Sequence, residues 1–387
     1  SSVWAVPEGT PVFPFEPVIT VKGPLIEAQF IEAALLMMIN YQSLIATKAS
    51  RIVRAADGRE VYEFGTKRAH EASAAVYGAR AAFIGGCNAT SDVVASKEFG
   101  IPAFSTMTHS LVQAFDSEYE AFKYYASQFP NNCVLLVDTY STVKSGVPNA
   151  IKVFDEVLKP MGVRPKGIRI DSGDITYLSK KARRMLDDAG YADCHITVSN
   201  SVNEDIIRDM LIQGAPVDSF AVGEQLITAA SCPCLNGVYK LSAVEEKGEI
   251  IPRIKISDNT GKITTPGSKT VWRLFDREVG KAIADVVTLS TEEIDQNAPY
   301  ELFDPIHTWK RKTVDNFVAR RLLQPIFVNG QCVYSSPTLP EIQNYCRSQI
   351  SSLWEEVTRF ENPHHYYVDM SEKLWNVRQE LLTKFSK

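Results

Sequence analysis

The stretch Gly167–Asp174 holds the residues with the clearest capacity for chemistry. Its two isoleucines are apolar and β-branched, so the stretch should begin as a short strand, with Arg169 between them facing the opposite way. The strand runs directly into Asp171 and Asp174, which flank a Ser-Gly pair. A guanidinium and two carboxylates are thereby placed at the C-terminal end of a strand, where α/β folds present groups to ligands. A structural Arg–Asp pair followed by a turn would account for the same residues.

Polar residues follow four other predicted strands in the same way. With the Arg169 strand they make five polar strand ends, which in register would form the rim of one site, as in barrel enzymes. The residues concerned are Ser105–His109 after the strand 103–105, Asp138 after 133–137, Ser199 and Asn200 after 196–198, and Gly223 and Glu224 after 219–222.

The segment Tyr62–Glu71 is a further candidate for ligand binding. Phe64 offers a ring face, and Lys67 and Arg68 are adjacent cations, a combination that suits a planar anion or a phosphate. A helix start with a solvated charge pair explains the same spacing. His109 lies between a predicted strand and an apolar helix, where it could act in the site or serve only as a structural residue.

Gly223 separates a predicted strand from a helix start at Glu224. The free N–H groups of such a start bind phosphate well. Because the Glu224 carboxylate is a poor neighbour for a phosphate, the backbone would have to make the contact.

The elements that must position these residues alternate between strand and helix. Six strand-then-helix units at regular spacing imply a parallel sheet. The first strand is not followed by a glycine-rich dinucleotide fingerprint, which argues against a Rossmann domain. Periodicity does not decide between a closed barrel and an open sheet. We expect strands at 82–84, 103–105, 133–137, 168–170, 196–198 and 219–222, and helices at 92–99, 117–129, 149–158, 175–189 and 203–213.

The segments before and after this region lack its regular strand–helix alternation, and they predict a second domain. Short strands are expected in 1–22 and a helix over 24–52, whose apolar stripe should pack into a core. Later strands are expected at 238–241, 253–256 and 270–274, with a hairpin turn at 258–261, followed by helices at 341–354 and 370–385. Residues 59–238 would then form the catalytic domain, inserted into a domain made of 1–58 and 239–387. The stripe comprises Leu25, Phe30, Ala33, Ala34, Met37 and Met38.

Composition is that of a soluble globular protein. The 387 residues are 45% hydrophobic and 22% charged, with a net charge of −5, which argues against a nucleic-acid binder. No uninterrupted apolar run has the length of a membrane span. The seven scattered cysteines suggest reduced thiols and a cytoplasmic protein. A metal site formed by Cys232, Cys234, Cys332 and Cys346 is a weaker alternative, because the spacings are unusual for zinc.

The motifs together resemble the nicotinate phosphoribosyltransferase family over almost the whole chain. The family joins nicotinate to phosphoribosyl pyrophosphate, giving nicotinate mononucleotide and pyrophosphate with coupled ATP hydrolysis. The resemblance implies an irregular, TIM-like α/β barrel of a type II phosphoribosyltransferase packed on a split α/β sandwich domain, with small-molecule substrates and a homodimer. The matching motifs are Phe64–Arg68, Ser105–Ser110, Asp138–Ser141, Ile168–Asp174, Val198–Asn200, Val222–Gly223, Val238–Leu241 and Thr265–Lys269.

The resemblance also implies roles for the nicotinate pocket and the coupling site. Phe64 would stack on the pyridine ring, Arg169 would bind the nicotinate carboxylate, and Thr106 would line that pocket. His109 matches the histidine that the family phosphorylates from ATP.

For phosphoribosyl pyrophosphate, the roles implied by the resemblance fall on cations, carboxylates and backbone. Lys67, Arg68 and Lys144 would offset the pyrophosphate charge. Asp171, with Asp138 or Asp174, would hold ribose hydroxyls or Mg²⁺. The remaining contacts would be those of Ser199 and Asn200 with the ribose, and of Gly223 and the Glu224 backbone with the 5′-phosphate.

Three departures from the family pattern leave alternatives open. An N-terminal portion that should carry a ring-stacking tyrosine is missing from this sequence by comparison with the family. Glu224 stands where some relatives have Thr, and Asp92 stands where nicotinate enzymes tend to have Asn. The alternatives are an enzyme that uses nicotinamide or quinolinate, and a truncated, inactive homologue that serves as a dimer partner.

Overall fold

The computed structural model describes residues 1–258 and 262–385, and the chain divides into two compact units. Unit 1 comprises 1–37 and 237–387, and unit 2 comprises 38–236. The second boundary lies next to the expected residue 238. The first lies inside a helix, at residue 37 rather than 58, because that helix begins in one unit and ends in the other.

Unit 2 is built on a six-stranded sheet in which every strand pair is parallel. The sheet order is β4-β3-β8-β7-β6-β5, so the first strand of the unit pairs with the last. That pairing curls the sheet as in a barrel. Among the described residues the barrel is not closed, because β4 and β5 are the two edge strands and do not pair with each other. The strands are β3 (Glu60–Glu63), β4 (Ala89–Thr90), β5 (Val134–Leu136), β6 (Gly167–Ile170), β7 (His195–Val198) and β8 (Ser219–Val222).

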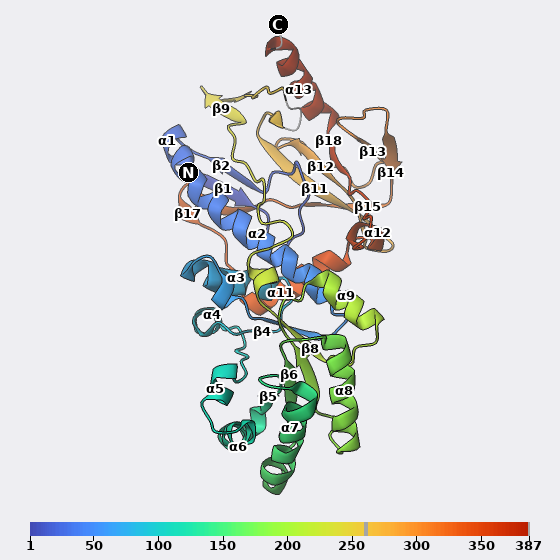
Figure 1. Cartoon of the computed structure of the whole chain (residues 1–387). Coiled ribbons are helices and arrows are strands. Elements are labelled where there is room, and N and C mark those ends of the chain that lie inside the picture. Colours follow the sequence, from blue (N-terminus) through green and yellow to red (C-terminus); the bar gives the residue numbers. More distant parts are fainter. Residues whose placement is uncertain (259–261, 386–387) are drawn as a thin grey trace. The chain divides into compact units, whose positions relative to one another are not determined.

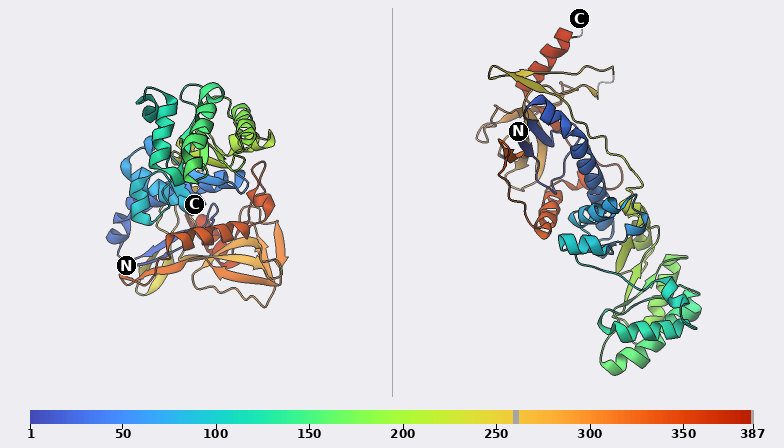
Figure 2. Two further views of the ribbon diagram at one scale, coloured as in Figure 1. Left: turned by 90° about the horizontal axis from the view of Figure 1, so that it is seen from below. Right: turned by 90° about the vertical axis from the view of Figure 1, so that its left-hand side faces the viewer.

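Helices connect these strands and cover the sheet. Helix α8 packs against β6 and β7, and α7 packs against α6 and α8 (Figures 1 and 2). The helices are α3 (Ala72–Ile84), α4 (Val93–Phe99), α5 (His109–Gln113), α6 (Glu118–Gln128), α7 (Val147–Val153), α8 (Ile175–Asp188), α9 (Glu204–Ile212) and α10 (Glu224–Ile227). Short 3₁₀ segments lie at Thr66–Arg68, Pro130–Asn132 and Lys159–Met161, and π-helical segments at Thr142–Gly146 and Phe154–Leu158.

Two expected strands of unit 2 are wrong or reduced. Residues 82–84 belong to α3, because the alanine-rich segment that contains them favours helix. The segment 103–105 contributes only one bridge, between Thr90 and Ala103. The strands β3 and β4 were missed, since the glutamates of β3 do not resemble a buried strand.

Unit 1 joins both ends of the chain in mainly antiparallel sheets. β1 (Ser2–Ala5) lies between β2 (Ile19–Lys22) and β16 (Gln324–Val328), and β16 also pairs with β17 (Gln331–Cys332). A second sheet has the order β15-β11-β12-β18, with β18 parallel to β12. Its strands are β11 (Lys269–Asp276), β12 (Ala282–Leu289), β15 (Phe317–Arg321) and β18 (Val368–Met370), and the unit also contains the hairpin of β13 (Tyr300–Phe303) and β14 (Arg311–Val314), α11 (Leu339–Ser351), α12 (Glu355–Thr358) and α13 (Glu372–Phe385).

The expected strands 238–241 and 253–256 are wrong. The strands here are β9 (Ala243–Glu246) and β10 (Glu249–Pro252), joined by a tight turn in which Lys247 and Gly248 both have positive φ. Of the expected turn at 258–261, residues 259–261 lie outside the described part of the chain.

The helix expected over 24–52 is confirmed as α1 (Leu25–Phe30) and α2 (Glu32–Ala55), but its expected core face is wrong. All six residues of the apolar stripe are exposed, and α2 buries only residues of its second half, from Ile45 to Ala55. Periodicity identified the helix but not which part of it is covered. By length and composition alone, the segment Leu25–Ala55 could cross a membrane, although no uninterrupted apolar run within it is that long. Core helices of soluble proteins pass the same test.

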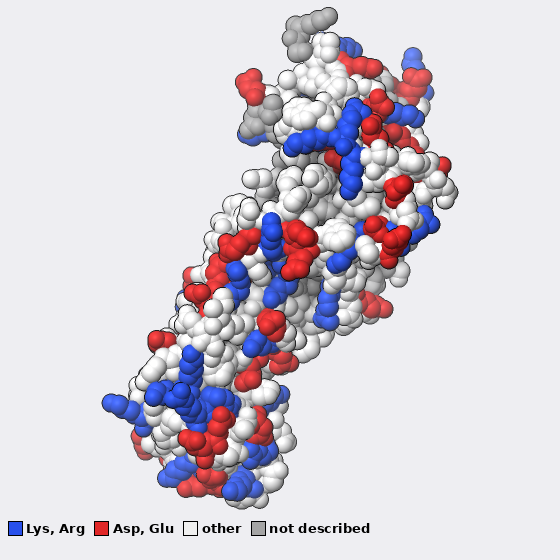
Figure 3. Space-filling model, turned by 90° about the vertical axis from the view of Figure 1, so that its right-hand side faces the viewer, with Lys and Arg blue, Asp and Glu red and all other residues white. Residues whose placement is uncertain are grey.

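Charged side chains of both signs are interspersed on the face drawn in Figure 3. Exposed ion pairs of the protein include Arg164 with Asp193 and Arg311 with Glu301. Pairs of this kind contribute little to stability.

Candidate active site

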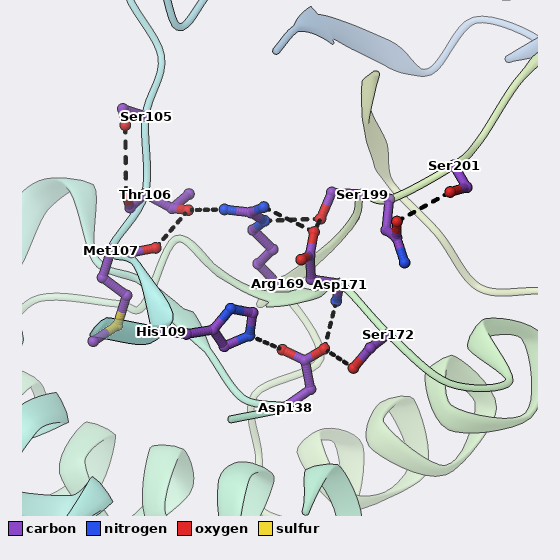
Figure 4. A network of polar contacts seen from close by, with 11 residues as sticks. Ser105, Thr106, Met107, His109, Asp138, Arg169, Asp171, Ser172, Ser199 and Ser201 are labelled. Carbon is purple, nitrogen blue, oxygen red and sulfur yellow. Dashed lines mark hydrogen bonds and ion pairs between the residues drawn. The ribbon is translucent and has the colours of Figure 1, made fainter. Parts of the chain in front are cut away.

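The candidate site lies at the C-terminal edge of the unit 2 sheet. In the β5–β6–β7 register Arg169 stands beside Leu136 and Thr197, so the residues that follow these three strands meet at one edge. The structure thereby brings together side chains from three strand ends and from the Ser105–His109 segment (Figure 4).

Arg169 is the centre of this arrangement. Its Nε donates to Ser199 Oγ, its Nη1 to Thr106 Oγ1 and its Nη2 to Asp171 Oδ1, each at 2.9 Å. The ion pair with Asp171 is largely buried, with 15% of the Arg169 side chain exposed. The guanidinium carbon also lies 5.5 Å from the centre of the Phe64 ring. Three directed hydrogen bonds and a ring contact hold the guanidinium in one orientation.

Asp138 orients two other parts of the site. Its side chain is 2% exposed, and its Oδ1 lies 3.2 Å from Nε2 of His109. Its Oδ2 accepts from the backbone N–H of Asp171 at 2.9 Å and from Ser172 Oγ at 2.5 Å. The resemblance implied that Asp138, with Asp171, holds ribose hydroxyls or Mg²⁺. Within the protein, its side chain contacts His109 and the end of β6.

The His109 tautomer follows from these contacts. An ionised carboxylate only accepts hydrogen bonds, so the proton facing Asp138 belongs on Nε2. The lone pair is then on Nδ1, which points away from Asp138 in Figure 4. His109 is the first residue of α5, and Thr108 caps that helix through the N–H of Leu111.

The two carboxylates expected to bind metal have different surroundings. Asp171 Oδ1 accepts from Arg169 and from Ser199, and Asp174 Oδ1 caps α8 through the N–H of Tyr177. No cluster of three or more metal-ligating side chains occurs among the described residues. Any cation bound here would therefore take ligands from substrate as well as protein.

Three exposed cations also lie at strand ends of this sheet, two of them on the loop after β3. Lys67 and Arg68 are exposed on the 3₁₀ segment Thr66–Arg68, and Arg68 Nε lies 3.9 Å from a Glu224 carboxylate oxygen. Lys144 is exposed on the π-helical segment after β5, so the three cations come from two strand ends. The Glu224 contact shows that the ends of β3 and β8 face one another.

The residues after β7 and β8 have an unusual backbone. Asn200 and Ser201 have φ of 72° and 47°, a conformation that side chains rarely adopt and that often marks functional sites. At Gly223 a Cβ would lie 3.0 Å from the Phe64 carbonyl oxygen, so a side chain here would press on the neighbouring strand end. Helix α10 begins directly after Gly223, as predicted, but is only four residues long.

Sequence reasoning missed two features of this site. The positioning role of Asp138 depends on contacts with residues 29 and 33 positions away, which no local pattern reveals. Glu63 was noted only as part of the Tyr62–Glu71 segment, yet it is a buried carboxylate directly before Phe64. It shares a face of β3 with the buried Val61, two residues earlier, and that spacing was the available signal.

The alternative metal site of four cysteines receives no support, because no cluster of three or more metal-ligating side chains occurs among the described residues. Cys232 and Cys234 are exposed in unit 2, whereas Cys332 is exposed and Cys346 buried in unit 1. All seven cysteines are free.

Comparison with known proteins identifies relatives along the whole chain. Residues 268–378 match the family model "Nicotinate phosphoribosyltransferase C-terminal domain". The chain is 46% identical to a nicotinate phosphoribosyltransferase of Bacillus subtilis, over 97% of this chain and 76% of the relative, and 39% identical to one of Mycobacterium tuberculosis, over 94% and 72%.

Solved structures agree in fold. Human nicotinic acid phosphoribosyltransferase superposes with a TM-score of 0.83 at 27% identity, covering 100% of this chain and 82% of that one. A nicotinate-nucleotide pyrophosphorylase from Pyrococcus furiosus gives 0.71 at 28% identity, covering 91% and 80%. This chain belongs to the nicotinate phosphoribosyltransferase family.

Proposed function

We propose that this protein is the enzyme that transfers the phosphoribosyl group of phosphoribosyl pyrophosphate to nicotinate, giving nicotinate mononucleotide and pyrophosphate for NAD salvage. The observation that carries the proposal is the fixed Arg169 guanidinium beside the Phe64 ring. An aromatic ring next to an oriented guanidinium suits a planar substrate that carries a carboxylate.

Arg169 retains donors for such a substrate. An arginine has five N–H groups, and the contacts to Ser199, Thr106 and Asp171 use three of them, one on each nitrogen. One N–H remains on each terminal nitrogen, which matches the two oxygens of a carboxylate. The pyridine ring would stack on Phe64 while its carboxylate meets this pair of donors.

The amide alternative rested on Asp92, and the observed contacts weaken it. Asp92 is 5% exposed, its Oδ1 accepts from the N–H of Ala95, and its Oδ2 accepts from Thr66 Oγ1. Asp92 thus caps α4 and holds the neighbouring loop. Both oxygens have a structural partner, so the carboxylate is not presented to an amide.

For phosphoribosyl pyrophosphate, the proposed contacts follow the strand ends. Lys67, Arg68 and Lys144 would stabilise the negative charge that develops on the leaving pyrophosphate. The ribose would lie at Asp171, Ser199 and Asn200, and the 5′-phosphate at the backbone of Gly223 and Glu224.

The donor set fits Mg²⁺ bound together with substrate. Asp171 and Asp174 each use only Oδ1 within the described structure, which leaves one hard oxygen donor apiece. When bound, the ion would neutralise charge on the pyrophosphate. Asp138 would act by holding the Asp171 backbone and His109, not as a ligand.

We further propose that ATP phosphorylates His109 and that the protein works as a cytoplasmic homodimer. Support for the histidine comes from its 39% exposed side chain, at the same edge as the proposed transfer site, and from the carboxylate that orients it. A nucleophilic nitrogen oriented by a carboxylate is the arrangement that covalent catalysis requires. The free cysteines agree with a reducing compartment.

One product assay tests the proposed function. The enzyme is incubated with phosphoribosyl pyrophosphate and either nicotinate or nicotinamide, with and without ATP, and the mononucleotides are separated by chromatography. We expect nicotinate mononucleotide as the main product, in greater yield with ATP. If product formed with nicotinamide and not with nicotinate, the substrate would be the amide. If neither compound gave product, an inactive homologue would be favoured.

A further inference from the structure

Glu63 is a carboxylate buried behind the proposed anion-binding loop. It is the last residue of β3, directly before Phe64, and it is 1% exposed. Its hydrogen bonds come from the backbone N–H of Gly65 and the hydroxyl of Thr90, and no cation of the described chain contacts it. A buried carboxylate without a cation is costly, so its presence needs a reason.

A continuous chain of hydrogen bonds leads from Glu63 back to the loop. Glu63 Oε2 accepts from Thr90 Oγ1 at 2.6 Å, and Thr90 Oγ1 accepts from the N–H of Asp92 at 2.9 Å. Asp92 Oδ2 in turn accepts from Thr66 Oγ1 at 3.1 Å. Glu63 and Thr90 are register partners on adjacent parallel strands, which places their side chains together. These hydrogen bonds therefore hold the loop at two points, Gly65 and Thr66.

The packing leaves this loop little freedom. A Cβ on Gly65 would lie 2.4 Å from Ile227 Cβ and 2.6 Å from Glu63 Oε1, and the N–H of Phe64 bonds to the Val222 carbonyl at 2.8 Å. The two cations that follow are exposed, and their one ion pair with the described residues is the long Arg68 contact with Glu224. Their position is set by the buried side of the loop.

We infer that Glu63, acting through Thr90 and Asp92, is a positioning residue that fixes the Phe64–Arg68 loop and hence its aromatic ring and both cations. This inference rests on the proposed function of that loop. It assigns the network to substrate binding and not merely to fold stability.

The protonation state of Glu63 is part of this argument. Burial raises the pKa of Glu63 to about 7, with a smaller contribution from Asp92, while the Thr90 and Gly65 donors lower it. The other titratable groups facing Glu63 are the Cys87 thiol and the Tyr41 hydroxyl, whose pKa values are raised by burial and by Glu63.

Both Glu63 oxygens accept hydrogen bonds, which is the arrangement of the ionised form. A protonated carboxyl would have to donate to Thr90 Oγ1 and so would reverse that hydrogen bond. Since the folded pKa is raised above the ordinary value of 4.5, the proton is taken up as pH falls through about 7. The loop should then lose part of its anchorage.

The first test compares Thr90→Val with Thr90→Ser. Valine removes the hydroxyl that links Glu63 to Asp92 at nearly constant volume, and serine restores it. We expect Thr90→Val to raise the KM for phosphoribosyl pyrophosphate and the Kd for inorganic pyrophosphate, measured by calorimetry, about tenfold, the effect of one buried hydrogen bond left unmade. Thr90→Ser should recover most of this loss. Thr288→Val, which removes a buried, bonded hydroxyl from unit 1, is the matched control for stability.

The second test is the pH profile of Glu63→Gln. Wild-type kcat/KM for phosphoribosyl pyrophosphate should fall below about pH 7, and the glutamine variant should lose that dependence, since it cannot ionise. Titration of the substrate phosphates affects both proteins equally. Folded Thr90→Val with wild-type KM and Kd, or an unchanged pH profile in Glu63→Gln, would overturn the inference.

Wild-type behaviour separates this inference from the proposed function. If wild type forms nicotinate mononucleotide and Thr90→Val does so with equal KM, only the positioning inference fails. If wild type neither forms product nor binds pyrophosphate, the proposed function fails and the inference fails with it.

Discussion

Replacing Arg169 by alanine should abolish most of the preference for an acidic substrate. The guanidinium has three hydrogen bonds that preset its orientation, and it is 15% exposed, so its interaction with a substrate carboxylate is poorly screened. Truncating one partner of such a charge pair costs about 2–4 kcal/mol, or about 30- to 1,000-fold in kcat/KM for nicotinate. Asp171 is left without its cation, but its partial exposure keeps the loss of fold stability small.

The assay compares nicotinate and nicotinamide as substrates for wild type, Arg169→Ala and Arg164→Ala. Nicotinamide carries no charge, so its kcat/KM should fall much less in Arg169→Ala. Arg164 is a matched control, because it forms an exposed ion pair with Asp193 in the same unit and its loss should change kcat/KM less than twofold. Unchanged kcat/KM for nicotinate in Arg169→Ala, or equal losses for the two substrates, would refute the carboxylate role.

Three other predictions concern coupling, backbone packing and pH. Asp138→Asn should reduce the ATP-dependent phosphorylation of His109 at least tenfold, because an amide can face Nε2 as a donor and favour the wrong tautomer. In wild type, ³¹P NMR of the phosphorylated protein should place the phosphoryl group on Nδ1. Attachment to Nε2 would contradict the tautomer assigned to His109. Gly223→Ala should raise the KM for phosphoribosyl pyrophosphate, with a cost of about 1–2 kcal/mol, because its Cβ would press on the Phe64 carbonyl; unchanged kinetics would show that the strand ends can separate freely. Burial and the Asp285 carboxylate raise the pKa of Glu16 to about 10 from 4.5, so its contribution to stability is complete below pH 4.5 and is lost as pH rises towards 10. Urea unfolding at pH 5, 7 and 9 should show a decline, of at most about 1.4 kcal/mol per pH unit, that is absent in Glu16→Gln; equal slopes in the two proteins would exclude a neutral Glu16.

The strand ends of unit 2 could be predicted because their sequences carry a strong local signal. The apolar residues of β5, β6 and β8 are followed abruptly by polar groups, and all three strands were placed within a residue or two. The same signal misled at residues 82–84, where an apolar run is helical because its alanine-rich neighbours decide the conformation. At β3 the signal was absent although a strand is present, because the last residue of that strand is a glutamate that is buried and accepts hydrogen bonds.

The helix over residues 25–55 shows a second limit of sequence reasoning. Its periodicity was strong enough to identify α1 and α2, but periodicity describes a chain's own pattern and not the surface that covers it. In the described residues the apolar stripe from Leu25 to Met38 is exposed, and the buried part of α2 contains Lys48, which pairs with Glu204. Burial therefore followed tertiary partners, including a charged one, and not hydrophobicity alone.

Asp138 connects the two chemical parts of the proposed site. One oxygen orients His109, and the other holds the backbone N–H of Asp171, whose own carboxylate orients Arg169. Phosphorylation of His109 would place negative charge close to Asp138, and this carboxylate is almost fully buried, so the repulsion would be poorly screened. Movement of Asp138 would then be transmitted through one hydrogen bond to the end of β6. In this arrangement a change at His109, the residue proposed for ATP coupling, would alter the proposed substrate pocket although His109 does not contact Arg169 directly.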